Sequence, residues 1–504
     1  METETYDRNM NQPTTIPKGF GLAYVPEYGF NPYQCVCITN RPVFSLTYES
    51  LFVLNNSFQP EPLLCDRFAV SESGTTYLLT LCEGVTFSDG TPLRAEDAVA
   101  SLQAARDSAF YGSRFSKVAE FSARDDQTIE IKLLQAYENL PLLLDVPIVK
   151  AGTQEDDRPL GTGPYVFSEE QNGLCLRRNR AWWQDNRPPV EYDTILLTAA
   201  KDPAAVRDSF EFGDTTLVCA DLNAPNAVGY RCDYELWDCP SATMVYLGFN
   251  LNADLFSYHK LRRIVTHLID RESLIVSVFK GFGDAASLPC APDSPLYDRE
   301  LAMRYSYDLE AAAQILDSTS VWTDTPGTLL VSSADPTKME LARNIAESLT
   351  KNGLPMEVVA VDDESYRTRL TQGRYDAFLG ETRLSGTFDL TEFFRADGSL
   401  CYGGIYSAEM ESLCLDALEN SGNCYDLFRD VMDNAYFCPL LFKSYAVMAN
   451  RGTIGSLQPA VDCVFHLSGG RSLSDASVSY GELTGAPGEE SETETESETE
   501  STDD

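Results

Sequence analysis

The sequence predicts a mixed α/β protein built from more than one domain-sized unit. Its 504 residues exceed what one ordinary core organises, and this length indicates roughly three such units. The apolar fraction of 43% and the aromatic fraction of 11% are typical of a globular protein. In the second half, two strand-like stretches, 328–334 and 356–362, flank the helical pattern 339–353. This β-α-β alternation favours the α/β class.

The first half carries strand, turn and helix signals in close succession. Residues 76–87 are β-rich and bounded by turn residues, as in a strand, and Asp89-Gly90 marks the centre of the turn that follows. Residues 95–108 predict a helix because their apolar residues recur on one face. Glu96 and Asp97 suit the first turn of that helix, where the backbone dipole favours negative charge.

The remaining elements follow from the same patterns. They are a turn and two strands in 160–179, a strand in 244–252, two helices in 259–283, a helix in 307–318, a helix in 408–420 and a strand in 437–452. Asp270 fits an N-cap of the second helix in 259–283, and Gly281 fits its end. The turn at Gly161-Thr162-Gly163-Pro164 lacks the G-K-[ST] ending of a phosphate loop.

Charge and hydropathy exclude several classes of partner. The net charge is −39, and the nine acids of 489–504 leave about −30 on the rest, which opposes nucleic acid and anionic membrane surfaces as partners. No window approaches the ~20 apolar residues of a membrane helix. The first residues lack the features of a signal peptide, so the protein is cytosolic or its signal has been removed.

Nothing in the sequence points to catalysis, a cofactor or a metal. The three histidines, His259, His267 and His466, lie near no nucleophile motif, and the abundance of acids alone does not indicate a glycosidase. The 14 cysteines form no C-x-x-C, and we expect most of them to be small buried apolar groups. One or two disulfides remain open if the protein is exported. The expectation is therefore no enzyme and no cofactor.

Four stretches, in this order, resemble the extracellular solute-binding proteins of family 5, which include the oligopeptide-, dipeptide- and nickel-binding proteins of ABC importers. They are 48–105, 161–167 with 179–183, 246–252 with 261–275, and 439–459. Within the first, Asp89-Gly90-Thr91-Pro92 and Ala95-Glu96-Asp97 match the family pattern residue for residue. Arg94 replaces the usual Thr cap, so the capping box is expected to be lost. The resemblance runs from about residue 20 to 470.

The resemblance implies a periplasmic-binding-protein-like fold of the cluster C type. Two lobes are joined by two crossing strands, expected near 245–252 and 435–445, and the ligand is enclosed between the lobes. The implied boundaries are a flexible arm at 1–18, lobe I at 19–247 with an extra subdomain at about 46–160, lobe II at 248–437, a return to lobe I at 438–470 and a disordered acidic tail at 471–504.

The resemblance also implies function. The expected protein is the substrate-binding component of an ABC importer, a monomer that captures a solute, most readily a short peptide, and delivers it to a membrane permease. Alternatives on the same fold are a receptor for a chelated metal or a sugar, and a surface sensor or adhesion protein. Export is implied, either to the cell surface as a Gram-positive lipoprotein whose signal is absent from this sequence or to the periplasm.

The stretch GETRLSGTFDLTEFF, 380–394, falls where the family places a cleft loop. The aspartate that holds a peptide ammonium in the peptide-binding relatives has no match, because Leu384 stands near that position. From its chemistry, Arg383 could bind a carboxylate or another anion, and Glu381 or Asp389 could pair with an amine. The alternative is that Arg383 pairs with Glu381 or Asp389 at the lobe surface.

Further ligand-binding candidates come from the family layout. Phe30 and Tyr33 are expected to line the cleft, with ordinary core packing as the alternative. Tyr402, Tyr406 and Asn250 are weaker candidates. Trp182 and Trp183 match a family motif interpreted as structural packing.

Overall fold

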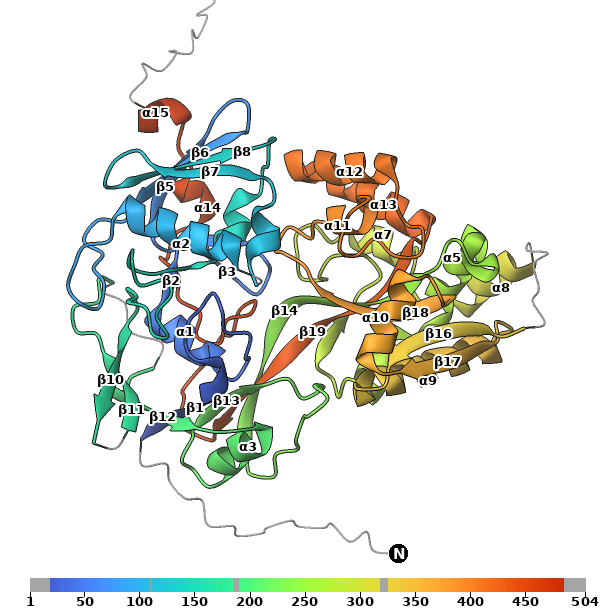
Figure 1. Cartoon of the computed structure of the whole chain (residues 1–504), viewed down its shortest axis with the longest axis horizontal. Helices are drawn as coiled ribbons and strands as arrows, with labels where there is room; N and C mark the ends of the chain where they lie inside the picture. The colour runs from blue at the N-terminus through green and yellow to red at the C-terminus, as the bar shows by residue number, and fades with distance from the viewer. Residues whose placement is uncertain (1–18, 109, 172, 185–189, 318–324, 485–504) are drawn as a thin grey trace, which may run out of the picture.

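The structure is a computed structural model and describes residues 19–484, except 109, 172, 185–189 and 318–324. Two long strands, β14 (Tyr234–Phe249) and β19 (Phe437–Asn450), lie at its centre and join the two sides of the molecule (Figure 1). They are antiparallel, and five strands continue the sheet beyond β19 and three beyond β14. The mixed α/β, two-lobed fold expected from the sequence is confirmed.

The sheet on the β19 side belongs to the first lobe. From the outside inward its strands are β10 (Tyr165–Glu170), β11 (Gly173–Arg178), β12 (Thr194–Ala199), β1 (Phe20–Tyr24) and β13 (Leu217–Ala220). Two helices, α1 (Arg41–Thr47) and α3 (Pro203–Glu211), contact these strands. The first lobe therefore draws on both ends of the chain, because β19 follows the whole of the second lobe.

A separate four-stranded sheet has a hydrophobic core of its own, and we call this unit the subdomain (Figure 1). Its strands and the elements beside it are β5 (Cys65–Val70), β6 (Thr76–Leu81), β8 (Thr128–Leu133), β7 (Val118–Ala123), α2 (Ala95–Asp107) and the short pairs β2 (Glu49–Ser50) with β9 (Pro147–Ile148) and β3 (Phe52–Leu54) with β4 (Pro60–Pro62). Helix α2 keeps half of its capping box, since Asp97 Oδ2 accepts a hydrogen bond from the Arg94 backbone at 2.9 Å. The guanidinium of Arg94 offers no acceptor for the other half.

The sheet on the β14 side belongs to the second lobe. Its strands are β18 (Ala377–Arg383), β16 (Gly327–Ser332) and β17 (Met356–Val361), and the short β15 (Gly283–Ala285) pairs with β19. Strands β16 and β17 are parallel with helix α9 (Pro336–Lys351) between them in the chain, as the β-α-β pattern predicted. The other helices are α4 (Asp254–Ser257), α5 (His259–Leu268), α6 (Arg271–Ser277), α7 (Arg299–Met303), α8 (Leu309–Asp317), α10 (Asp363–Thr371), α11 (Thr391–Phe394), α12 (Ala408–Glu419) and α13 (Cys424–Asp433).

Local signals set several of these boundaries. Asp270 caps α6 by accepting a hydrogen bond from the Ser273 backbone, as predicted. Single 3₁₀ turns are η1 (Pro26–Tyr28), η2 (Gly112–Phe115), η3 (Leu140–Leu143) and η4 (Ser421–Asn423). All 14 cysteines are free thiols and none is exposed, which agrees with their expected role as small buried groups.

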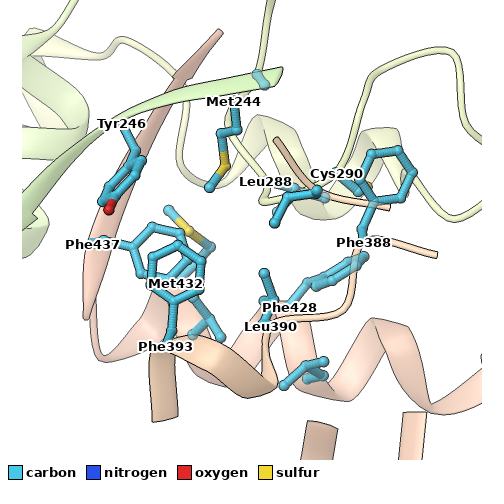
Figure 2. Packing of buried hydrophobic residues seen from close by; sticks show 14 of the residues in the cluster. Met244, Tyr246, Leu288, Cys290, Phe388, Leu390, Phe393, Phe428, Met432 and Phe437 are labelled. Carbon is cyan, nitrogen blue, oxygen red and sulfur yellow. The ribbon is translucent and has the colours of Figure 1, made fainter. Parts of the chain in front are cut away.

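The core of the second lobe is rich in aromatic rings. Figure 2 shows Tyr246 of β14 beside Phe393 and Phe437, with Met244 and Met432 in the same cluster. The rings of Phe393 and Phe437 stack with centroids 4.5 Å apart. Strand β18 pairs with β14 along its whole length, from Ala377 opposite Phe249 to Arg383 opposite Thr243. The residues that follow β18 therefore leave the sheet at the Thr243 end of this pairing.

Replacing Gly380 with alanine should lower the free energy of unfolding by about 1–3 kcal/mol, because overpacking a tight core forces side chains apart. A Cβ on Gly380 would lie 2.3 Å from Cζ of Tyr246, which is 2% exposed. Urea unfolding of the two proteins measures the difference. Gly455 has no neighbouring atom within 4 Å of such a Cβ, so Gly455→Ala is the matched control. Equal stability of both variants would contradict the expectation.

The expectation of disorder from residue 471 onward is wrong for 471–484. Helices α14 (Leu473–Ala476) and α15 (Tyr480–Thr484) follow the return segment, and Ala476 is fully buried against the subdomain. Arg471 fixes this segment by donating to the backbone of Cys65 and Asp66. The segment 471–484 is polar in composition, but the contacts of Arg471 and Ala476 hold it against the subdomain. The rest of the predicted tail, 485–504, and the predicted arm, 1–18, lie outside the described residues.

Candidate ligand-binding site

A cavity of about 120 Å³ lies between the first lobe, its subdomain and the end of β18. We call it the inner cavity. Its charged lining comes from five separate parts of the chain: Arg41, Glu49, Arg114, Asp145, Arg383 and Asp462. Aromatic and aliphatic side chains make up most of the remaining wall, including Phe44, Tyr48 and Phe110. An apolar wall with a few convergent charges is typical of a small-solute site.

Two guanidiniums share one carboxylate at the base of the inner cavity. Asp462 Oδ1 lies 3.0 Å from Arg41 Nη1, and Oδ2 lies 2.5 Å from Arg383 Nη2. The Asp462 side chain is 9% exposed. Burial alone would raise the pKa of Asp462, but the guanidiniums of Arg383 and Arg41 outweigh burial and hold this pKa below its ordinary value.

Aromatic rings hold these guanidiniums in place. Arg41 and Arg383 lie over the ring of Phe110, 5.0 and 4.7 Å from its centroid. Arg114 lies 5.0 Å from the centroid of Tyr111 and forms a close ion pair with Asp145. Each ring face attracts a cation. The group as a whole has three guanidiniums against two carboxylates.

Glu49 is a buried carboxylate that faces the same cavity without an ion pair among the described residues. Its two oxygens accept hydrogen bonds from Trp182 Nε1 at 3.1 Å, Trp183 Nε1 at 2.9 Å and Thr162 Oγ1 at 2.7 Å. Burial raises the pKa of Glu49 to about 7, and the three donors only partly offset that rise. The two tryptophans therefore hold a carboxylate in addition to packing.

A second ionic group joins strand β18 to strand β19 and helix α9. Glu381 pairs with Lys338 of α9 at 3.1 Å and with Lys443 of β19 at 3.6 Å. Lys443 also pairs with Asp221 of the first lobe at 2.7 Å, and Lys338 with Asp335 at 3.4 Å. Burial raises the pKa of Glu381, but the two lysines reverse this shift and lower it. This group has three carboxylates and two ammonium groups, so it carries an excess negative charge. The group of Arg41, Arg114 and Arg383 with Asp145 and Asp462 carries an excess positive charge.

The residues of 380–394 divide between these places. Arg383 reaches the inner cavity, and Glu381, two residues earlier on the same face of β18, joins the second group. Arg383 pairs with neither Glu381 nor Asp389, because its partner is Asp462. Asp389 is directed into a local turn, where its Oδ1 accepts from the backbone and hydroxyl of Thr391 at 2.8 and 2.6 Å. Burial raises the pKa of Asp389.

The other predicted site residues lie in packed surroundings. Phe30 is 2% exposed and packs on Tyr24 and Phe167, and the hydroxyl of Tyr33 donates to the Pro147 carbonyl at 2.8 Å. Asn250 donates to the carbonyls of Gly373 and Tyr375. Tyr402 packs on Phe378, and Tyr406 is half exposed. None of these five lines the inner cavity, so their role in binding stays a prediction.

Sequence reasoning missed most of the charged lining of the inner cavity and the lysines of the second ionic group. Lys443 and Glu49 did carry a usable signal, since each is a lone charge within an apolar, strand-like run. Arg41, Arg114 and Asp462 sit in unremarkable loops and helix starts and are brought together by the fold. No group of three or more His, Cys, Asp or Glu side chains in the described part of the chain is placed to hold a metal ion. Likewise, no described helix is long and apolar enough to cross a membrane.

Comparison with known proteins identifies relatives. Residues 59–398 match the sequence profile of the bacterial extracellular solute-binding proteins, family 5. The glutathione-binding protein GsiB of Escherichia coli strain K12 is 24% identical over 347 residues, which cover 66% of this chain and 67% of GsiB.

Two solved structures share the fold. The ABC transporter substrate-binding protein CtaP of Listeria monocytogenes has a TM-score of 0.71 at 18% identity, covering 91% of this chain and 99% of CtaP. The oligopeptide-binding protein AppA of Bacillus subtilis, solved with a nonapeptide, has a TM-score of 0.60 at 20% identity, covering 86% of this chain and 95% of AppA.

Proposed function

The chain belongs to family 5 of the bacterial extracellular solute-binding proteins, and from that premise we propose that its inner cavity anchors the carboxylate of a short peptide. The protein is the solute-binding component of an ABC importer. It captures its solute between the two lobes and delivers it to a membrane permease. The relatives named for glutathione and for an oligopeptide support a peptide-like solute.

The observation that carries this proposal is the carboxylate shared by Arg41 and Arg383. Two guanidiniums on Asp462 leave one positive charge without its own counter-ion in surroundings largely shielded from water, because Glu49, the third carboxyl group of the cavity wall, has a pKa raised to about 7 and is protonated below it. An uncompensated charge there costs free energy that a bound anion recovers. A planar carboxylate matches the fork of a guanidinium, which makes it the preferred occupant.

The second ionic group supplies a negative charge for the other end of the solute. Its excess carboxylate, with the Glu381 side chain 28% exposed, suits the ammonium group of a zwitterionic solute. Glu381 and Arg383 are two residues apart on β18, so the two charge excesses lie along one strand. A peptide with both termini free carries the matching pair of charges.

Binding is coupled to closure of the lobes. Arg383 comes from the second lobe, whereas Arg41 and Phe110 come from the first, so closure assembles the anion site. A solute that binds the closed form better shifts the population toward it. In this mechanism lobe I covers 19–247, lobe II covers 248–437, and the chain returns to lobe I at 438–470. The protein acts as a monomer outside the cytoplasm, at the cell surface as a lipoprotein or in the periplasm.

Replacing Arg383 with methionine should weaken binding of trialanine with free termini by about 10- to 100-fold, the range of one charge-assisted contact of 1.5–3 kcal/mol. Methionine keeps an apolar stem on Phe110 but removes the charge. Titration calorimetry of the ligand-stripped protein measures the change. Trialanine with an amidated carboxyl end should bind the variant and the parent equally.

The matched control is Arg429→Met on α13. Arg429 pairs with Asp426 and Asp430 on the surface, outside the inner cavity. Binding in this variant should match the parent. If amidated and free trialanine lost the same affinity in Arg383→Met, the carboxylate role of Arg383 would be wrong.

A further inference from the structure

A tight turn of the return segment places Asp462 in the wall of the inner cavity. Ala460 and Cys463 close this turn with two backbone hydrogen bonds, of 2.8 and 3.1 Å. Asp462 is the third residue of the turn and has a φ of 56°, a conformation that Asp adopts more readily than most residues. Its N–H donates to the Pro240 carbonyl of β14 at 2.8 Å. The carboxylate of Asp462 therefore stands on a fixed backbone.

The guanidiniums that meet this carboxylate come from both lobes. Asp462 accepts hydrogen bonds through Oδ1 from Arg41 and through Oδ2 from both Nε and Nη2 of Arg383. Arg383 ends strand β18 of the second lobe, while Arg41 begins helix α1 of the first. At this point the two lobes are therefore joined by a carboxylate of the protein itself.

Of the two guanidiniums, that of Arg383 is the more open to exchange of its partner. The side chain of Arg383 is 22% exposed, against 13% for Arg41. Asp462 binds Arg383 through a single oxygen, whereas the fork of a guanidinium can hold both oxygens of a carboxylate at once. A second carboxylate in the inner cavity would therefore bind Arg383 more fully than Asp462 does, while Asp462 stays paired with Arg41.

We propose that Asp462 is a built-in substitute for the solute carboxylate, and that a solute binds by taking the place of Asp462 on Arg383. This inference rests on the proposed function, because it needs a solute with a free carboxylate. The exchange leaves two ion pairs, Arg41 with Asp462 and Arg383 with the solute, so the incoming carboxylate neutralises the excess positive charge of the group. Displacing Asp462 takes up part of the binding free energy. Asp462 therefore lowers the affinity for carboxylates.

The test compares the affinities of three proteins for one solute. Titration calorimetry measures the binding of trialanine with free termini to the ligand-stripped parent, to Asp462→Asn and to Asp462→Gly. Removing the competing carboxylate should tighten binding by about tenfold or more, the lower end of the range for one charge-assisted contact. A residue that only held the arginines in place would give the opposite result, weaker binding. Trialanine with an amidated carboxyl end should bind all three proteins equally, because it brings no anion.

Asp145→Asn is the matched control. It removes another carboxylate from the wall of the inner cavity, but that carboxylate pairs with Arg114. The net charge of the cavity changes by the same amount while Arg41 and Arg383 stay occupied. Affinity for trialanine should therefore rise by less than about threefold, since this change acts only at a distance. A rise as large as that of the Asp462 variants would show that net charge alone matters, and the exchange would be wrong.

The results distinguish this inference from the proposed function. If the parent binds trialanine and both Asp462 variants bind it equally or more weakly, the exchange is overturned and the proposed function is left intact. Binding of trialanine by none of the proteins would overturn the proposed function itself. Asp462→Gly keeps the test decisive if Asp462→Asn fails to fold, because glycine adopts the positive φ of this turn freely.

Discussion

Replacing Asp462 with asparagine should lower the free energy of unfolding by about 3–5 kcal/mol, because removing one partner of a buried ion pair leaves the other uncompensated. In this protein two guanidiniums, of Arg41 and Arg383, would lose their shared carboxylate. Asp462 has a φ of 56°, a conformation that asparagine also adopts readily, so the loss reports on charge rather than on the backbone. Denaturant unfolding followed by circular dichroism measures it.

Two further variants isolate the cause. Asp397→Asn removes a carboxylate that is 83% exposed and pairs with Arg395, and its effect should stay within about 1 kcal/mol. Adding Arg383→Met to Asp462→Asn should restore part of the lost stability, because it removes one of the uncompensated charges. If the effects of Asp462→Asn and Arg383→Met simply added, the charge-sharing account of the inner cavity would be refuted.

The second large effect is a pH dependence from Glu49. Burial raises the pKa of Glu49 from 4.5 to about 7 in the folded protein. Between these values the native state holds a proton that the unfolded state has released, so rising pH favours unfolding. The free energy of unfolding should therefore fall through this window, and by about 2–3 kcal/mol between pH 5 and pH 8 from this group alone. Above about pH 8 both states are ionised and the slope disappears.

Comparison with Glu49→Gln extracts this contribution. Other carboxylates, among them Asp462 and Glu381 with lowered pKa values, give slopes of the opposite sign, but they are common to both proteins and cancel in the difference. Unfolding free energies of parent and variant are measured at pH 5, 6, 7 and 8. The parent should lose stability relative to the variant as pH rises. A difference that stays constant across this range would show that Glu49 does not titrate there.

Secondary structure followed the local patterns of the sequence where the signals were strong. The helix expected at 95–108 is α2, Ala95–Asp107, and the helix expected at 339–353 is α9, Pro336–Lys351. The strand expected at 244–252 is the end of a longer one, because β14 begins at Tyr234. Its first half contains Pro240 and charged residues, and the register shift after Pro240 accommodates them. Strand signals are weak where a bulge interrupts the ladder.

The candidate site was predicted only in part. Arg383 and Glu381 stood out because charges gathered in one short stretch, and both lie in ionic groups that span the two lobes. Asp389 belonged to the same stretch, yet it turns inward to Thr391. A strand directs alternate side chains to one face, which explains the placement of Arg383 and Glu381, but the loop after β18 follows no such period.

By itself, the sequence determined the class of fold, the strongest helices and strands and the family, because periodicity and turn chemistry act between residues close in the chain. Only the tertiary structure decided which carboxylate pairs with which guanidinium. Asp462 lies 79 residues from Arg383 and 421 from Arg41 in sequence, and the ion pairs form because the return segment brings it between them. Coulomb attraction depends on distance in space and on burial, and both are properties of the packed lobes.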